Sequence, residues 1–179
     1  MANTNGPFGL RPSRSASGGE PRTTQYTITA ASAAAIYLGD PVGFSSGTVV
    51  IGTDAGTAHL GVFAGCQYVN ASGDIIFSKR WPADTGASEV KALVWDDPNQ
   101  LFTIQSDGTT ATTVASIGVA YDLDVTAGTA SIGVSKTVLQ PGATSGAAYK
   151  VLGLIDKPDN AWGIYSEVEV IAVKHALAS

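Results

Sequence analysis

The stretch from Val90 to Gln105 constrains the fold more than any other part of the chain. Two dense apolar runs, residues 90–95 and 101–104, flank the sequence DDPNQ at residues 96–100. Proline presets φ, and Asp and Asn side chains bond nearby backbone amides, so residues 96–100 favour a turn. Both runs are rich in β-branched and aromatic residues and are apolar on both faces. We therefore predict a β-hairpin, buried on both sides, at the centre of a β-domain.

Short apolar runs separated by glycine-containing turns continue along the chain. About ten strands with this spacing predict an all-β fold, an antiparallel β-sandwich or barrel-like body. At most one short helix is expected, at residues 30–38, where alanine is abundant and Gly39-Asp40-Pro41 ends the run. Besides the hairpin, the predicted strands are residues 24–29, 42–44, 48–51, 60–69, 75–79, 112–120, 124–125, 129–134, 150–154 and 164–175.

Residues 1–22 have no hydrophobic periodicity and contain three prolines and four glycines. This composition predicts an extended N-terminal arm with no helix and no paired strand, followed by a β-rich body at residues 23–179. Phe8 and Leu10 are apolar and need a place to be buried. Two alternatives remain open: the arm folds back on its own domain, or it reaches a neighbouring subunit.

Charge is low and unevenly distributed, with 14% charged residues and a net charge of −5. Residues 1–22 contain three arginines and one glutamate, whereas the remainder has 7 basic and 14 acidic residues. A basic arm on an acidic body is expected to dock on an acidic surface, another copy included. The acidic body argues against a nucleic-acid partner. Because no apolar run reaches membrane-spanning length and the start is unlike a secretory signal, we expect no membrane partner and folding in a host cytoplasm.

Signals for catalysis or metal binding are weak. Cys66 is the single cysteine and lies in an apolar run, so we expect a core residue, with neither an internal disulfide nor a cysteine zinc cluster. The two histidines, His59 and His175, are too few for a persuasive metal site. Nucleophile-elbow and Walker motifs are absent. We therefore predict a protein that is not an enzyme and has no cofactor and no metal.

Three groups of acidic residues were candidates for chemistry. Asp96-Asp97 can be a carboxylate pair, but Asp-Asp-Pro-Asn favours a turn. Asp122 and Asp124 can bind a cation from alternate positions of a strand, yet no calcium loop follows them. Asp156, Asp159 and Asn160 can also bind a cation, although a turn before the final strand is favoured. The structural alternatives to these sites are a turn at 96–100, a strand at 122–124 and a turn at 156–160.

The tryptophans offer a further set of candidate contacts. Trp95 lies in the predicted hairpin and is expected in the core. Trp81, in KRWPA, and Trp162, in DNAWG, have turn-like neighbours, so both are predicted to be exposed. Exposed tryptophans either anchor a protein interface or stack on a sugar, and interface anchoring is favoured here.

The sequence NGPFGLRP at residues 5–12 resembles the start of small structural proteins encoded beside the major capsid protein of tailed phages. The likeness extends over nearly the whole chain, and its motifs are structural, not catalytic. The chain resembles the capsid decoration, or cement, proteins of these phages. The further motifs that carry the likeness are YTI at 26–28, GDPV at 39–42, LGVFAGCQY at 60–68, WPA at 81–83, DP at 97–98 with Phe102, and PDN at 158–160.

The resemblance implies a β-rich homotrimer on the outer capsid surface of the virion, bound to the major capsid protein and bridging capsomers. It implies an arm that contacts neighbouring subunits. We expect deletion of residues 1–12 to leave the body folded but to weaken capsid binding. The contact residues predicted in the arm are Pro7, Phe8, Leu10, Arg11, Pro12 and Arg14. Two alternatives remain: another virion subunit, from the tail tube or head completion, or a carbohydrate-binding β-module for host attachment.

Overall fold

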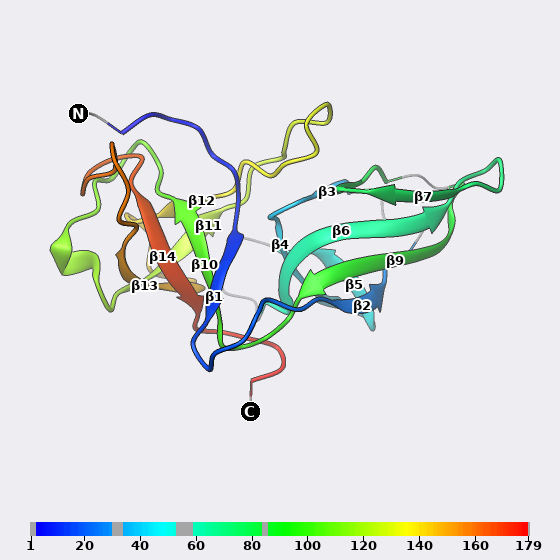
Figure 1. Ribbon diagram of the computed structural model, residues 1–179, viewed down its shortest axis with the longest axis horizontal. Coiled ribbons are helices and arrows are strands. Elements are labelled where there is room, and N and C mark those ends of the chain that lie inside the picture. The colour runs from blue at the N-terminus through cyan, green and yellow to red at the C-terminus, as the bar shows by residue number, and fades with distance from the viewer. Residues whose placement is uncertain (1–2, 30–33, 53–58, 84–85, 179) are drawn as a thin grey trace.

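The computed structural model describes residues 3–29, 34–52, 59–83 and 86–178. Its regular structure is nearly all antiparallel β, so the predicted all-β class is confirmed (Figure 1). One short 3₁₀ helix, η1 (Val114–Ser116), interrupts the strands. The strands are β1 (Arg11–Ser15), β2 (Thr24–Thr27), β3 (Ile36–Tyr37), β4 (Pro41–Ser45), β5 (Thr48–Ile51), β6 (Gly61–Val69), β7 (Ile75–Ser78), β8 (Arg80–Trp81), β9 (Ser88–Trp95), β10 (Gln100–Gln105), β11 (Ala120–Asp124), β12 (Val138–Gln140), β13 (Tyr149–Leu154) and β14 (Glu167–Ala172).

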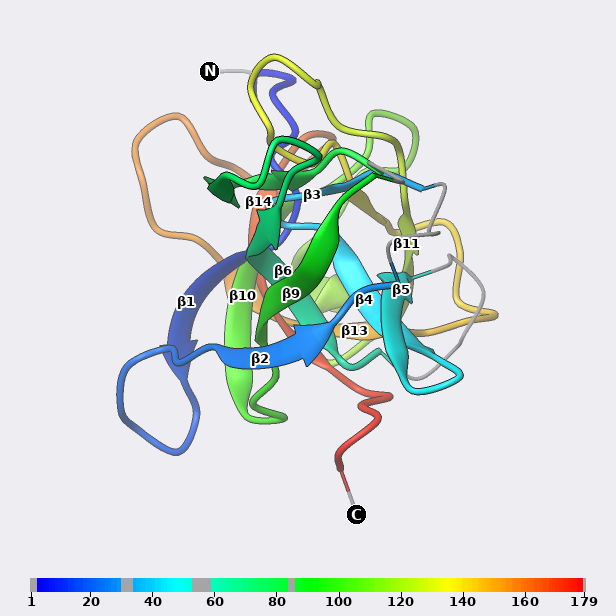
Figure 2. The same ribbon diagram turned by 90° about the vertical axis from the view of Figure 1, so that its right-hand side faces the viewer.

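Two large sheets contain most of these strands and lie beside one another along the long axis (Figure 1). The first sheet has the order β1-β10-β14-β13-β11-β12. The second has the order β2-β9-β6-β4-β5, with β7 also paired to β6. Figure 2 views the molecule from the end formed by the second sheet. Strands β3 and β8 form a separate pair. No helix in the described ranges is long and apolar enough to cross a membrane.

The predicted hairpin at Val90 to Gln105 is wrong, although both of its strands and its turn are present. Strand β9 pairs with β2 and β6 in the second sheet, whereas β10 pairs with β1 and β14 in the first. Each strand therefore has a neighbour on both edges, and neither neighbour is the other strand. Strand β10 is buried along nearly its whole length, as predicted, whereas β9 alternates: Val90, Ala92 and Val94 are buried and Lys91 is exposed. The expected burial on both faces is therefore wrong for β9, which has one face toward the second core. The stretch connects the two sheets.

Both aspartates of this connection accept hydrogen bonds. Asp96 accepts bonds from the hydroxyls of Tyr26 and Thr24, at 2.6 and 3.0 Å, and both donors lie on β2. Asp97 accepts a bond from the backbone N–H of Asn99 at 2.8 Å, which is a local turn bond. The turn interpretation of this pair is confirmed. Because Asp96 is tied to β2, the chain leaves the second sheet here instead of folding back on β9.

Each sheet has its own hydrophobic core. The first core is built mainly from β10 to β14, and the second mainly from β3 to β9. Val62 of β6 belongs to the first core, and Trp95 at the end of β9 packs against it. The ends of two strands of the second sheet therefore join the two cores.

The first sheet combines the two ends of the chain. Strand β1 pairs antiparallel with β10, so the expectation of an arm without a paired strand is wrong. The predicted boundary at residue 22 falls where the chain crosses between the sheets, after β1 and before β2 at Thr24. Of the residues before it, Arg11–Ser15 form an edge strand of the first sheet. An edge strand tolerates Pro12 because proline lacks an N–H for the sheet.

Three other local predictions differ from the structure. Of the predicted helix at 30–38, residues 30–33 lie outside the described residues, and residues 36–37 form β3. Residues 112–120 form η1 and a turn, because Thr113 and Ser116 make a reciprocal capping box. Residues 129–134 form turns closed by a single bridge between Thr129 and Val134. Of these differences, only the pairing of β3 with β8 is a contact between distant residues.

The thiol of Cys66 provides a test of the second core. The predicted burial of Cys66 is confirmed, with 2% of the residue exposed, and burial raises the pKa of the thiol to about 12. Little thiolate exists at pH 8, so we expect a disulfide reagent to react at least about tenfold more slowly with the native protein than with protein unfolded in guanidinium. Equal rates would show that this core opens readily. The readout is the absorbance of the released thiol reagent.

Candidate interaction surface

The first residues of the chain are attached to the loop before β14. The Asn3 side chain donates hydrogen bonds to the carbonyl oxygens of Ala161 and Ile164, at 2.8 and 2.9 Å. It also accepts a bond from the N–H of Ala161 at 3.0 Å. Three bonds to one loop fix the start of residues 3–15, which we call the N-terminal segment.

Gln105, at the end of β10, holds the next part of the N-terminal segment. Its side-chain oxygen accepts a bond from the N–H of Gly6 at 2.9 Å. Its amide donates to the carbonyl oxygens of Thr4 and Tyr165, at 3.0 and 3.2 Å. Gln105 is buried, and a buried amide without partners is costly. The N-terminal segment therefore satisfies a polar group of the first sheet.

Residues 8–10 pack the N-terminal segment between the two sheets. Leu10 is fully buried in the first core, and its N–H donates to the carbonyl oxygen of Gly39 at 2.9 Å. Gly9 has φ +71°, and a Cβ there would lie 2.6 Å from the Cβ of Ser135. Only glycine fits both the left-handed backbone and this close approach. The sequence FGL thus has a packing reason.

Strand β1 is fastened to β14 by an ion pair across β10. Arg14 contacts Glu169 with its guanidinium at 2.7 Å, and Ser13 donates to the same carboxylate at 2.9 Å. The bonds from Arg14 lower the pKa of Glu169, although partial burial opposes this. One arginine of the basic arm therefore pairs with a carboxylate of its own chain. The guanidinium of Arg14 remains exposed, so screening by solvent keeps this contact weak.

The predicted contact residues of the N-terminal segment fall into two groups. Phe8 and Leu10 are buried within their own chain, so the alternative in which the arm folds back on its own domain describes this structure. Arg11 and Arg14 are exposed, and Pro7 and Pro12 are half-buried. A neighbour can therefore reach the second group, whereas Leu10 is fully buried and Phe8 offers only the small part of its surface that lines a depression. Deleting residues 1–12 would remove Leu10 from the first core. The structure therefore contradicts the expectation that the body keeps its stability after this deletion.

The two tryptophans predicted to be exposed differ from each other. Trp81 is fully buried in the second core, where its ring meets the edge of Tyr68. The prediction of Trp81 as a surface anchor is wrong, because pairing of β8 with β3 turns the KRWPA motif inward. Trp162 is half-buried against the first core. Only Trp162 of the pair offers any surface to a partner.

The remaining acidic groups bond to nearby loops. The buried Asp122 accepts from the N–H of Gly146 at 2.9 Å, and Asp124 accepts from the hydroxyl of Thr126 at 3.1 Å. The Asn160 side chain bridges residues 155 and 167, which is the predicted turn before the last strand. Within the described residues, no group of three or more His, Cys, Asp or Glu side chains is placed to hold a metal ion.

Asp40 supports the loop on which Leu10 rests. Its carboxylate accepts bonds from the N–H of Tyr37 at 2.8 Å and the hydroxyl of Thr137 at 3.4 Å. Desolvation raises the pKa of Asp40, and its hydrogen bonds, including one with Ser135, oppose the rise. This buried carboxyl links the loop at 37–40 to residues 135–137, and both flank the N-terminal segment.

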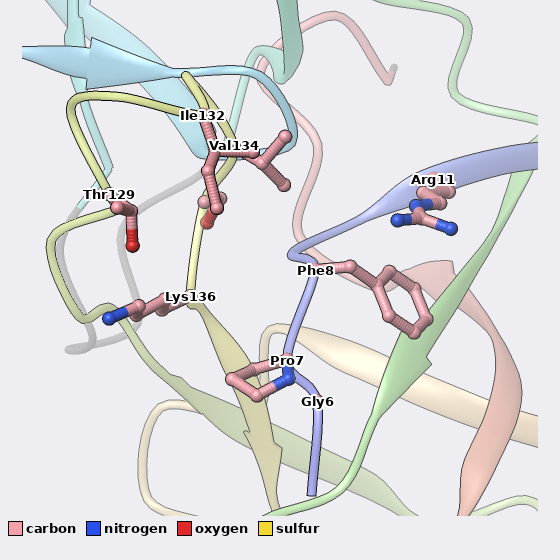
Figure 3. A pocket seen from close by; sticks show the side chains of 9 residues that line it. Gly6, Pro7, Phe8, Arg11, Thr129, Ile132, Val134 and Lys136 are labelled. Carbon is pink, nitrogen blue, oxygen red and sulfur yellow. The ribbon is translucent and has the colours of Figure 1, made fainter.

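A groove runs between the N-terminal segment and residues 129–136 (Figure 3). Pro7, Phe8 and Arg11 lie on one side of it, and the opposite side carries Ile132 and Lys136. Its volume is about 280 Å³. The guanidinium of Arg11 lies 4.1 Å from the centroid of the Phe8 ring, a cation–π contact that orients the charge. The groove exists because Gly9 and Leu10 hold the N-terminal segment in place.

Sequence reasoning missed Gly9, Asp40 and Gln105 as the residues that hold the N-terminal segment. Glycine between two large apolar residues was the available signal for Gly9. Nothing in the sequence indicates that Asp40 and Gln105 are buried beside a segment distant in the chain.

Comparison of the chain with models of protein families, with curated proteins and with solved structures found no match. The resemblance of residues 5–12 to capsid decoration proteins stays a prediction.

Two glycines allow a matched test of the close approach between the N-terminal segment and Ser135. Gly9 and Gly18 both have positive φ, +71° and +80°, but nothing lies within 4 Å of a Cβ at Gly18. We expect Gly18→Ala to lower the free energy of unfolding by about 1 kcal/mol, from backbone strain alone. We expect Gly9→Ala to lower it by roughly 2–4 kcal/mol, because overpacking adds to the strain. Equal losses in chemical denaturation would contradict the close approach to Ser135.

The raised pKa of Asp40 predicts a pH dependence. Because the folded pKa exceeds the ordinary value of 3.8, ionisation of Asp40 opposes folding. The wild type should therefore lose stability relative to Asp40→Asn as pH rises from 3.8 through the folded pKa, with no further change above it. Denaturation of both proteins over a pH series measures this difference, from which shared titrations cancel. A difference that grows in favour of the wild type with rising pH would contradict the assignment.

Proposed function

We propose that this protein is a non-enzymatic structural subunit of a tailed-phage virion that binds the outer capsid surface and stabilises the shell by bridging capsomers. The major capsid protein is its proposed partner, and a homotrimer its proposed assembly. Exposed apolar side chains at two opposite ends of the molecule carry this proposal. The resemblance of residues 5–12 to decoration proteins supports the capsid as the partner.

One apolar patch lies on β7. Ile75 and Phe77 are 61% and 74% exposed, and alternate residues of a strand face the same side. The other patch surrounds η1, where Val114 and Ile117 are 65% and 48% exposed. Strand β7 and η1 lie at opposite ends of the long axis (Figure 1). We call these the β7 patch and the η1 patch.

Two such patches suit a protein that ties two neighbours together. Burying exposed apolar surface against a partner is favourable, at about 25 cal/mol per Å². Contacts at both ends make the second attachment intramolecular, so modest contacts combine into firm binding. A subunit held at both ends resists separation of the neighbours.

The alternatives have less support in the residues at hand. A sugar platform would need stacking surfaces, and the buried Trp81 does not provide one. A tail-tube or head-completion subunit would use the same two patches on a different partner. The identity of the particle part that binds the protein separates these functions.

Binding to shells tests the proposal. Empty shells assembled from the major capsid protein of the same phage would be mixed with wild type, Phe77→Ser, Val114→Ser or the double variant. Sedimentation measures binding, and thermal disruption measures shell stability. We expect each single variant to keep partial binding but lose shell stabilisation, since one end is free. The double variant should bind at least about tenfold more weakly, a change of about 1.4 kcal/mol.

Val173→Ser is the matched control, because Val173 is 45% exposed but lies outside both patches. It should bind and stabilise as the wild type does. If the wild-type protein does not bind shells but binds isolated tails, the protein is a tail subunit and the proposal is wrong. Full stabilisation by the double variant would refute bridging through these patches.

A further inference from the structure

The groove beside the N-terminal segment continues into a second depression along β1. The second depression, of about 270 Å³, shares Phe8, Arg11 and Val134 with the groove. Its other apolar lining residues are Leu10, Pro12, Leu38 and Trp95. The two depressions make a track with apolar walls that is longer than one side chain.

The track has basic side chains on a chain whose net charge is −5. Arg11 and Lys136 line it. Within the described ranges, neither Arg11 nor Lys136 forms an ion pair, whereas Arg14 is paired with Glu169. Positive charge that is not neutralised on the surface favours an anionic partner.

Acidic side chains near Lys136 lie in a different hollow. Asp107 and Asp124 line a separate depression that also includes Lys136 and Tyr165. An anionic ligand would be repelled from that hollow and attracted to the Arg11 side. The charge distribution therefore gives the track a preferred end.

We propose that this track binds an extended acidic polypeptide segment that inserts one aromatic or branched apolar side chain into the groove between the N-terminal segment and Ile132. The groove volume of about 280 Å³ is at the lower limit of small-molecule pockets, so it suits a single side chain. Flanking carboxylates of the segment pair with Arg11 and Lys136. A nucleic acid is disfavoured because the body is acidic.

This inference goes beyond bridging through the β7 and η1 patches, since it names a third surface and the chemistry of its ligand. It concerns the purified protein alone, so it can fail while shell binding holds, and the reverse is equally true. Ile132 is 65% exposed at the groove edge, which leaves it accessible to a partner.

Synthetic peptides test the proposal by nuclear magnetic resonance of the full-length chain. The probe is a blocked pentapeptide, Asp-Glu-Phe-Glu-Asp. Its controls replace the acids with Asn and Gln, or replace Phe with Ser. We expect the acidic Phe peptide to shift amides of residues 7–11 and 129–136, with an affinity that falls as salt rises. Both control peptides should bind at least about tenfold more weakly, because each lacks one half of the recognition.

Charge reversal in the protein supplies the matched pair of variants. Lys136→Glu should weaken binding of the acidic Phe peptide by about tenfold or more. Lys91→Glu makes the same change at an exposed lysine of β9 outside the track and should have little effect. Equal binding of all three peptides, or equal loss in both variants, would overturn the proposal. Self-association of the chain that Ile132→Ser abolishes would assign the track to a second copy and would also overturn it.

Discussion

Burial of Leu10 is the contact on which the arrangement of the two sheets depends. The side chain completes the first core, while its backbone N–H bonds to Gly39 in the loop that precedes β4. Full burial of a leucine contributes roughly 1.5–3 kcal/mol, a large share of the net stability of a domain this size. Because Gly9 has no side chain, the segment lies close enough to Ser135 for both contacts to form.

Buried polar groups favour this path of the N-terminal segment over other paths. Gln105 and Asp40 are buried, and their hydrogen bonds come from segments distant in the chain. An alternative path of the N-terminal segment would leave these groups without partners, which costs more than an ordinary hydrogen bond contributes. Apolar burial therefore holds the segment, and polar satisfaction defines its path.

This path changes where a partner can bind. A free arm would have offered Phe8 and Leu10 to a neighbour, but both belong to the chain's own interior. The same packing creates the groove along Arg11. The N-terminal segment thus forms one wall of a surface that we propose for binding, and this surface is a product of the tertiary structure.

The sequence by itself determined the all-β class, the burial of Cys66, the turn at 96–100 and most strands of the second sheet, because alternation and turn chemistry are local. It did not determine which strands pair. Val90 to Gln105 contains two real strands, yet each finds partners far away, and β1 has a local pattern that predicts no strand at all. Strand pairing and the burial of Trp81 depend on contacts between distant residues. Only the tertiary structure decides these, since the free energy of burial depends on what each segment meets.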